Sequence, residues 1–324
     1  MDLYPLRLEP QVKEIVWGGR WLAEVLGRPG KPDAPLGESW EAYSKSLINN
    51  GSLNGRQLNE LFDEYGGAFF GTAAMNYPKF PLLVKFIDAK DNLSVQVHPD
   101  NALAQELENY PLGKTEFWYV MAAEPGAEIC YGLNDSATSR EQLGQALAEK
   151  DLLRYLQRSP VKAGDVVYIP AGTVHALTKG IVVYELQQDS DITYRLYDWG
   201  RVGREIHIEK GLKAINLEYH NMQVTHPELK ADNGYARAQL IESPFFQSEL
   251  LRIDREASLK ASPDSFMLLS VIEGQGQLND PRGKWESEAL RKGDTLLIPA
   301  SLEFKLVSEQ HGEPLEVISG WLVK

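Results

Sequence analysis

Short apolar runs broken by Gly and Pro dominate the chain, and they predict β-strands rather than long helices. Residues 161–180, 180–188 and 294–307 each combine β-branched and aromatic residues with turn-forming Gly or Pro. Most of the sequence shows the same pattern of short apolar runs separated by turn residues. The pattern predicts a mainly β protein.

Three segments depart from the strand pattern and predict helices. Residues 53–71 and 136–159 carry apolar residues at helical spacing, and the second opens with Ser and Thr as candidate N-caps. A shorter segment, 100–110, follows the stretch SVQVHPD. We therefore expect helical insertions at about 53–71 and 136–159 within the β structure.

The stretch SVQVHPD (94–100) has an unusual polar face. Side chains alternate along a strand, so Ser94, Gln96 and His98 point one way while two valines point the other. The runs FPLLVKFI (80–87) and FWYVMAA (117–123) on either side are apolar. The polar face either meets solvent or lines an internal site.

A repeat of about fifteen residues predicts two copies of one β-unit. AGDVVYIPAGTVHAL (163–177) and KGDTLLIPASLEFKL (292–306) share the frame Gly-Asp-x4-Pro-Ala, 129 residues apart. Ser301 and Phe304 stand in the second copy where the first has Gly172 and His175. The repeat predicts duplicated barrels, with chemistry kept in the first alone.

Composition narrows the possible partners. The net charge is −13, which argues against non-specific nucleic-acid binding, and no apolar run approaches the roughly 18 residues that span a membrane. The single Cys130 excludes an internal disulfide, and the N-terminus lacks a secretion-signal pattern. We expect a cytoplasmic protein, and an anionic substrate would require specific Lys and Arg residues. The sequence carries no signal for an oligomeric state.

The first copy of the repeat has the frame G-x5-P-x-G-x2-H, the second motif of the cupin superfamily of small jelly-roll barrels. In place of the cupin His-x-His pair and Glu, the chain has Gln96-x-His98 and Glu116. QVHPDN with GKTEFWYV resembles the type I mannose-6-phosphate isomerase family in its short bacterial form. The resemblance covers most of the chain, including residues 10–22, 36–44, 83–101, 113–120, 170–177, 190–201 and 204–212.

The resemblance implies a fold, a metal site and a reaction. It implies two cupin-like jelly-roll β-barrels: a metal-binding catalytic region, 1–234, and a degenerate second barrel without metal ligands, 235–324. It implies one Zn²⁺ per chain, held by Gln96, His98, Glu116 and His175. The activity would be aldose–ketose isomerisation between mannose 6-phosphate and fructose 6-phosphate through a cis-enediolate.

The ligand types suit this chemistry independently of the family. Two imidazoles and a carboxylate are ordinary zinc donors. A neutral amide as the fourth ligand leaves about one net positive charge to polarise a sugar oxygen. Either histidine alone would more readily be read as structural, and the combination with Glu116 in a cupin frame favours a metal.

By motif position, the resemblance implies catalytic roles for Asp191, Arg195 and Lys114. Asp191 is one candidate proton carrier and metal-bound water another. Arg195 would hold oxyanion charge or orient the sugar, and Lys114 would donate to a sugar oxygen. For substrate binding we predict Ser94, Lys85 and Arg201, although Arg201 and Arg204 are equally consistent with a surface basic pair.

Two other interpretations remain open. One is a cupin enzyme acting on another substrate, such as another sugar phosphate or in metal-dependent oxidation. The other is a sugar-phosphate-binding protein that has lost turnover. Loss of ligand residues from the second repeat shows that such residues can disappear, but the first repeat keeps all four predicted ligands together with Asp191 and Arg195.

Overall fold

The chain forms two compact units, each made of segments that are not contiguous in the sequence. The computed structural model describes residues 3–309 and 313–324. The central unit comprises Val12–Ser39 and Lys85–His226. The terminal unit comprises the segment that ends at Gln11, Trp40–Val84 and Pro227–Lys324. The division into functional regions at residue 234 stays a prediction, and the compact units follow a different division.

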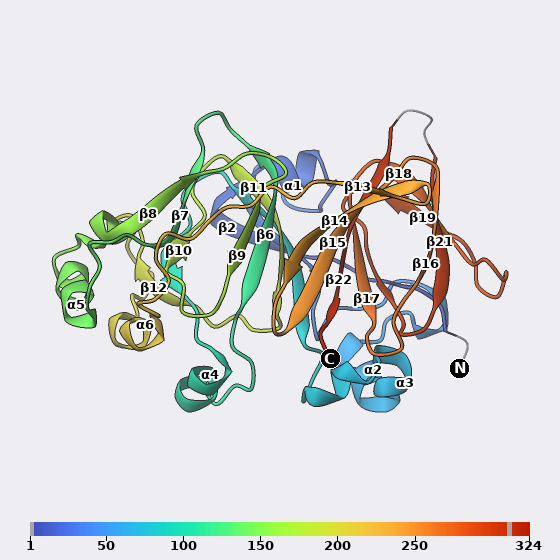
Figure 1. Ribbon diagram of the computed structural model, residues 1–324, viewed down its shortest axis with the longest axis horizontal. Helices are drawn as coiled ribbons and strands as arrows, with labels where there is room; N and C mark the ends of the chain where they lie inside the picture. Colours follow the sequence, from blue (N-terminus) through green and yellow to red (C-terminus); the bar gives the residue numbers. More distant parts are fainter. Residues whose placement is uncertain (1–2, 310–312) are drawn as a thin grey trace. The chain divides into compact units, whose positions relative to one another are not determined.

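Two sheets build the central unit (Figure 1), and three strands of the first sheet begin or end in segments assigned to the terminal unit. The six-stranded sheet has the order β2 (Gln11–Gly19), β3 (Leu36–Ala42), β4 (Leu82–Ala89), β11 (Ile181–Gln188), β6 (Glu116–Ala123) and β9 (Val166–Ile169). The five-stranded sheet has the order β12 (Tyr194–Tyr197), β5 (Val95–Val97), β10 (His175–Ala176), β7 (Glu128–Leu133) and β8 (Leu156–Pro160). Its helices are α1 (Trp21–Glu24), α4 (Asn101–Glu108), α5 (Arg140–Ala148), η3 (Leu152–Tyr155) and α6 (Ile208–Ala214).

The terminal unit repeats this plan. Its seven-stranded sheet has the order β1 (Leu6–Arg7), β20 (Thr295–Ile298), β17 (Met267–Glu273), β22 (Leu315–Leu322), β15 (Phe246–Ile253), β14 (Tyr235–Glu242) and β13 (Lys230–Asp232). Its four-stranded sheet has the order β16 (Glu256–Lys260), β21 (Glu303–Ser308), β18 (Gln275–Asn279) and β19 (Glu288–Arg291). Its helices are η1 (Gly51–Leu53), α2 (Leu58–Tyr65), α3 (Gly67–Phe70) and η2 (Ala73–Asn76).

The predicted fold class is confirmed: the chain is mainly β, with two cupin-like jelly rolls and short helical insertions. The sheets of each unit remain separate, so the units are open jelly rolls rather than closed barrels. Among the described residues, no helix is long and apolar enough to cross a membrane.

The helix predicted at 136–159 is wrong in its last four residues, and α5 itself covers only Arg140–Ala148. Ser139 caps α5 by accepting a hydrogen bond from the Gln142 backbone N–H, as the candidate N-cap implied. From Leu156 the chain turns into β8, which pairs antiparallel with β7. The sheet hydrogen bonds outweigh the helical spacing of the leucines. The predicted helices at 53–71 and 100–110 are present as α2 with α3, and as α4.

Opposite faces of the five-stranded sheet belong to different cores, and this decides the question raised by SVQVHPD. Val95 and Val97 pack with Leu143 and Leu147 of α5 in one buried cluster. The other face of the same sheet contributes Ile129 and Tyr131 to a second cluster, which packs between the two sheets. Because Gln96 alternates with the valines, its side chain lies on that second, internal face.

The two repeat copies adopt the same turn. Gly164 and Gly293 have φ values of 88° and 93°, a region that favours glycine. Each donates its N–H to a neighbouring strand, Gly164 to Val120 at 2.9 Å and Gly293 to Val271 at 2.8 Å. The predicted repeat is therefore structural as well as sequential.

Candidate metal centre

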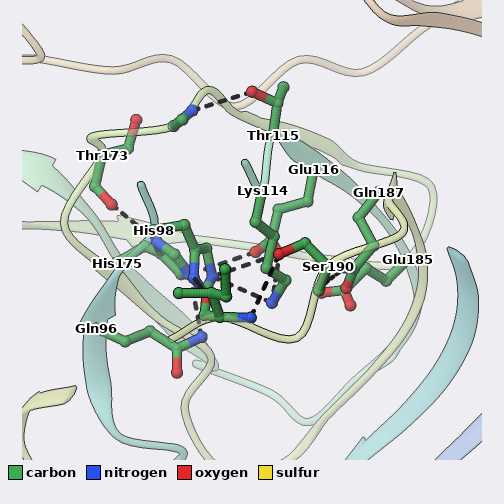
Figure 2. Close-up of polar contacts among 12 residues, drawn as sticks. Gln96, His98, Lys114, Thr115, Glu116, Thr173, His175, Glu185, Gln187 and Ser190 are labelled. Atoms are coloured by element: carbon green, nitrogen blue, oxygen red, sulfur yellow. Dashed lines mark hydrogen bonds and ion pairs between the residues drawn. The ribbon is translucent and has the colours of Figure 1, made fainter. Parts of the chain in front are cut away.

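Two imidazoles and one carboxylate meet inside the central unit. His98 follows β5, Glu116 begins β6 and His175 begins β10. Their ligand atoms all lie within 4.8 Å of one another, and the three residues are at most 1% exposed. The His98 Nε2 lies 3.5 Å from one Glu116 oxygen and the His175 Nε2 lies 3.3 Å from the other. Figure 2 shows the three side chains converging with Lys114.

Main-chain carbonyls fix both imidazole rings. The His98 Nδ1 lies 3.0 Å from the Ile192 carbonyl oxygen, and the His175 Nδ1 lies 2.9 Å from that of Thr173. A carbonyl only accepts, so each Nδ1 carries the hydrogen and each Nε2 presents its lone pair to the centre. This outer contact is how proteins orient metal-binding histidines.

The charge at the centre favours an ionised Glu116 carboxylate and a neutral His98 ring. Burial by itself would raise the pKa of Glu116, but Lys114, His98 and His175 beside it hold that pKa well below its usual range. Burial and the adjacent Lys114 lower the pKa of His98 well below its ordinary value. Both oxygens of Glu116 are buried, and neither has a hydrogen-bond partner among the described residues. One of them forms an ion pair with Lys114 Nζ at 3.0 Å. Oxygens in that state fit a bound cation.

Gln96 lies beside the centre, opposite His175 in the sheet. The two residues are register partners in β5 and β10. The Gln96 amide nitrogen lies 3.2 Å from His175 Nε2, and its oxygen accepts a hydrogen bond from Ser94 at 3.3 Å. A half-turn of the terminal amide exchanges oxygen and nitrogen, which are near-isosteric. An oxygen in the nitrogen's place would give the centre a fourth donor.

A cavity of about 260 Å³ lies beside this centre, and two of its lining residues, Gln96 and Lys114, contact the centre. The predicted residues Ser94, Gln96, Lys85, Lys114, Asp191 and Arg195 all line it. The remaining lining residues are Trp17, Glu38, Ile87, Leu93, Trp118, Glu185, Thr193 and Arg204. Four of the lining side chains are basic and three are acidic, so the cavity gathers the Lys and Arg residues that an anionic substrate would require in a chain of net charge −13.

Glu185 is a site residue that the sequence interpretation missed. It is 2% exposed, accepts a hydrogen bond from Trp118 Nε1 at 2.7 Å, and lies 3.2 Å from Lys85 Nζ. Burial and the nearby Glu116 raise the pKa of Glu185. Burial opposes the charge of Lys85, but Glu185 and Glu38 raise its pKa overall. A charged residue within the apolar run IVVYELQQ was the available signal.

The three arginines after β11 take different places. Arg195 lies on β12, and its register partner across the sheet is Gln96. Arg201 is not among the residues that line the cavity; its guanidinium bonds to Asp198 at 2.7 Å and to the Asn92 carbonyl at 2.7 Å. Arg204 lines the cavity and shares the same buried Asp198 at 3.0 Å.

A jelly roll that encloses two histidines and a glutamate is the site of a cupin-type metalloenzyme. The family model for the phosphomannose isomerase type I catalytic domain matches residues 5–125, and that for the mannose-6-phosphate isomerase cupin domain matches residues 237–310. The chain is 39% identical to a mannose-6-phosphate isomerase of Streptococcus mutans, covering 97% of each chain. It is 38% identical to the mannose-6-phosphate isomerase ManA of Bacillus subtilis, covering 94% of this chain and 96% of that one.

A solved structure agrees with the sequence relatives. The crystal structure of a mannose 6-phosphate isomerase from Bacillus subtilis superposes with a TM-score of 0.86 at 33% identity, covering 98% of this chain and 99% of that one. The chain therefore belongs to the type I phosphomannose isomerase family, as the sequence resemblance predicted.

Proposed function

We propose that this protein is a zinc-dependent aldose–ketose isomerase that interconverts mannose 6-phosphate and fructose 6-phosphate through a cis-enediolate. One observation carries the proposal: a buried Glu116 between two imidazoles whose Nε2 atoms face it, beside a cavity lined by four basic side chains. Family membership supports the same substrate. The single buried Cys130 and the metabolic relatives fit a cytoplasmic location.

The metal would be held by Gln96, His98, Glu116 and His175, one ion per chain. The ligand atoms of His98, Glu116 and His175 lie within 4.8 Å of one another, and Gln96 would reach the same point through its amide oxygen after a half-turn. When bound, Zn²⁺ would act as a Lewis acid on a substrate oxygen. Lys114 Nζ, 3.0 Å from Glu116, would turn toward the sugar once a cation neutralises that carboxylate.

The polar lining of the cavity would bind the sugar phosphate. Ser94 and Lys85 are buried in the cavity wall, and Arg195 has a buried Nε without a hydrogen-bond partner among the described residues. A planar guanidinium recognises phosphate and oxyanion oxygens in pairs. Because Arg204 lines the cavity and Arg201 does not, we add Arg204 as the second cation for the phosphate.

Proton transfer between C1 and C2 requires a group that exchanges its proton near neutral pH, and besides metal-bound water we consider two of the carboxyl groups that line the cavity. Asp191 lines the cavity and is solvent-exposed. Glu185 is buried in the same cavity, and burial has already raised its pKa. The variants Asp191→Asn and Glu185→Gln separate these roles: the carrier's loss should abolish exchange of the substrate C2 proton with solvent, whereas loss of the other group should leave exchange measurable.

The decisive experiment measures metal and turnover on one preparation. The protein is purified without added metal, its bound metals are quantified, and mannose 6-phosphate conversion is followed before chelation, after chelation and after zinc addition. We expect about one zinc per chain and activity that follows the metal. Bound zinc without conversion would contradict the substrate assignment, and glucose 6-phosphate then serves as the comparison substrate. Full activity after complete metal removal would contradict the metal centre.

A further inference from the structure

Arg195 lies on an edge strand, and a single residue satisfies its exposed backbone. Strand β12 is the last strand of the five-stranded sheet, with β5 on one side and, within residues 3–309 and 313–324, no strand on the other. The Arg195 N–H donates to His207 Nδ1 at 3.1 Å, and the His207 N–H donates back to the Arg195 carbonyl at 2.7 Å. Backbone groups at a sheet edge otherwise depend on water. His207 therefore replaces a neighbouring strand at this one position.

The same segment also holds the Arg195 side chain. Its Nη1 donates to the Glu205 carbonyl oxygen at 2.8 Å, two residues before His207. Its Nε remains buried without a partner among the described residues, in the wall of the cavity. The backbone and one edge of the guanidinium are thus fixed from outside the sheet. The rest of the guanidinium is left for a ligand.

Helix packing anchors His207. It immediately precedes α6, and its carbonyl accepts the Gly211 N–H at 2.8 Å. A Cβ at Gly211 would come within 2.3 Å of Leu196 Cδ2, so a glycine is needed for α6 to approach β12 this closely. Figure 1 shows α6 beside β12. The His207 Nε2 lies 3.6 Å from a Glu205 carboxylate oxygen, which favours the hydrogen on Nε2 and a free lone pair on Nδ1.

We propose that His207 is the positioning residue of Arg195: its Nδ1 lone pair, closing the edge of β12, sets the direction in which the guanidinium meets the substrate. The role rests on the proposed function, in which Arg195 contacts the sugar phosphate. The ring lies at the edge of β12, and it acts through the Arg195 backbone.

Two substitutions distinguish this role from general support of the fold. Asn places its Oδ1 where His places Nδ1, whereas Gln places its acceptor one bond further away. His207→Asn should keep kcat/KM within about threefold, and His207→Gln should lower it about ten- to a hundredfold, the usual effect of misplacing a binding group by about 1 Å. His226→Asn is the matched control, because His226 also bonds through Nδ1, to Asp165 at 2.9 Å, and lies outside the cavity lining.

A double-mutant cycle completes the test. If His207 acts through Arg195, the variant Arg195→Ala/His207→Gln should be no less active than Arg195→Ala alone. Metal content and the thermal midpoint of every variant are measured beside turnover, so that unfolding is recognised. Equal activity of the Asn and Gln variants, or an unchanged penalty in the Arg195→Ala background, would overturn the proposal.

A structural measurement keeps this inference separate from the proposed function. Crystal structures of His207→Asn and His207→Gln should show the contact from Arg195 Nη1 to the Glu205 carbonyl kept in the first and lost in the second. If the wild-type protein fails to convert mannose 6-phosphate while the two structures differ in this way, the proposed substrate is wrong and the positioning role stands. If Arg195 is unmoved in both, the positioning role is wrong.

Discussion

The two repeat copies share one fold but differ at corresponding positions, which are polar in the central unit and apolar in the terminal unit. In the central unit, His175 pairs with Gln96 across the sheet and Ile169 pairs with Glu116. In the terminal unit the corresponding pairs are Phe304 with Leu259 and Ile298 with Met267. Ala261 stands two residues beyond Leu259, as His98 stands two beyond Gln96. Every one of these replacements is apolar.

The difference shows how little of the fold depends on the polar centre. Phe304, Ala261, Leu259 and Met267 belong to or pack against one continuous hydrophobic core. Burying apolar surface stabilises a unit directly, whereas burying Glu116 costs free energy unless cations surround it. The terminal unit therefore needs no metal to complete its core. In the central unit, a charged site occupies the corresponding part of the core.

The largest expected effect comes from a substitution at the polar centre of the central unit. Glu116→Gln removes the negative charge between the two imidazoles and should lower turnover by more than about a hundredfold, since even contacts one layer outside a metal cost about 10–100-fold. Metal analysis and circular dichroism accompany the kinetics. Full metal content and activity in this folded variant would show that Glu116 is not a ligand.

The complementary experiment changes the apolar core of the terminal unit. Phe304→Ala should lower the free energy of unfolding by about 3–5 kcal/mol, because a large buried ring leaves a cavity. Bound metal per folded chain should not change. Urea unfolding and metal analysis measure both quantities. Metal content that falls with Phe304→Ala and not with Glu116→Gln would mean that the metal lies in the other unit.

A smaller effect concerns pH in the metal-free protein. Burial and Lys114 lower the pKa of His98, and Lys114 with the two neighbouring histidines lowers the pKa of Glu116 despite burial. At these two groups the unfolded chain therefore binds more protons than the folded chain does. The folded state loses stability as the pH falls, below about 6.5 because of His98 and below about 4.5 because of Glu116. Urea midpoints at pH 7.5, 6.5 and 5.5 should fall in this order. A flat profile, with the metal chelated throughout, would contradict these shifts.

The smallest effect is expected when one residue is exchanged between the two repeat copies. Gly172 and Ser301 occupy equivalent positions with φ values of 93° and 66°. Gly172→Ser should destabilise by about 1–3 kcal/mol through backbone strain, and its Cβ would also lie 3.0 Å from Asn216 Cβ. Ser301→Gly should change stability by less than about 1 kcal/mol, since relief of strain is offset by a more flexible unfolded chain. Thermal midpoints of the pair test the equivalence; equal losses in both variants would argue against it.

Much of this organisation was predictable because it depends on local spacing. Alternation placed Gln96 and His98 on one face, and the Gly-Pro-Gly-His frame marked the turn that carries His175. Glu185 and Arg204 escaped prediction because tertiary packing, rather than spacing, brings them to the cavity. The helix expected through residue 159 failed for the same reason, since Leu156 pairs with Leu133 in a distant strand.

The carbonyls of Ile192 and Thr173, which hold the two rings by Nδ1, have a kinetic consequence. A flexible pair of histidines would lose rotational freedom on capturing an ion, and that loss would slow capture and weaken retention. Here folding has already removed this freedom, so ring orientation is the same before and after an ion arrives. The rate of metal binding should then be limited by the passage of a hydrated ion through the cavity and by the loss of its water. This rate should not depend on the time that has passed since the chain folded.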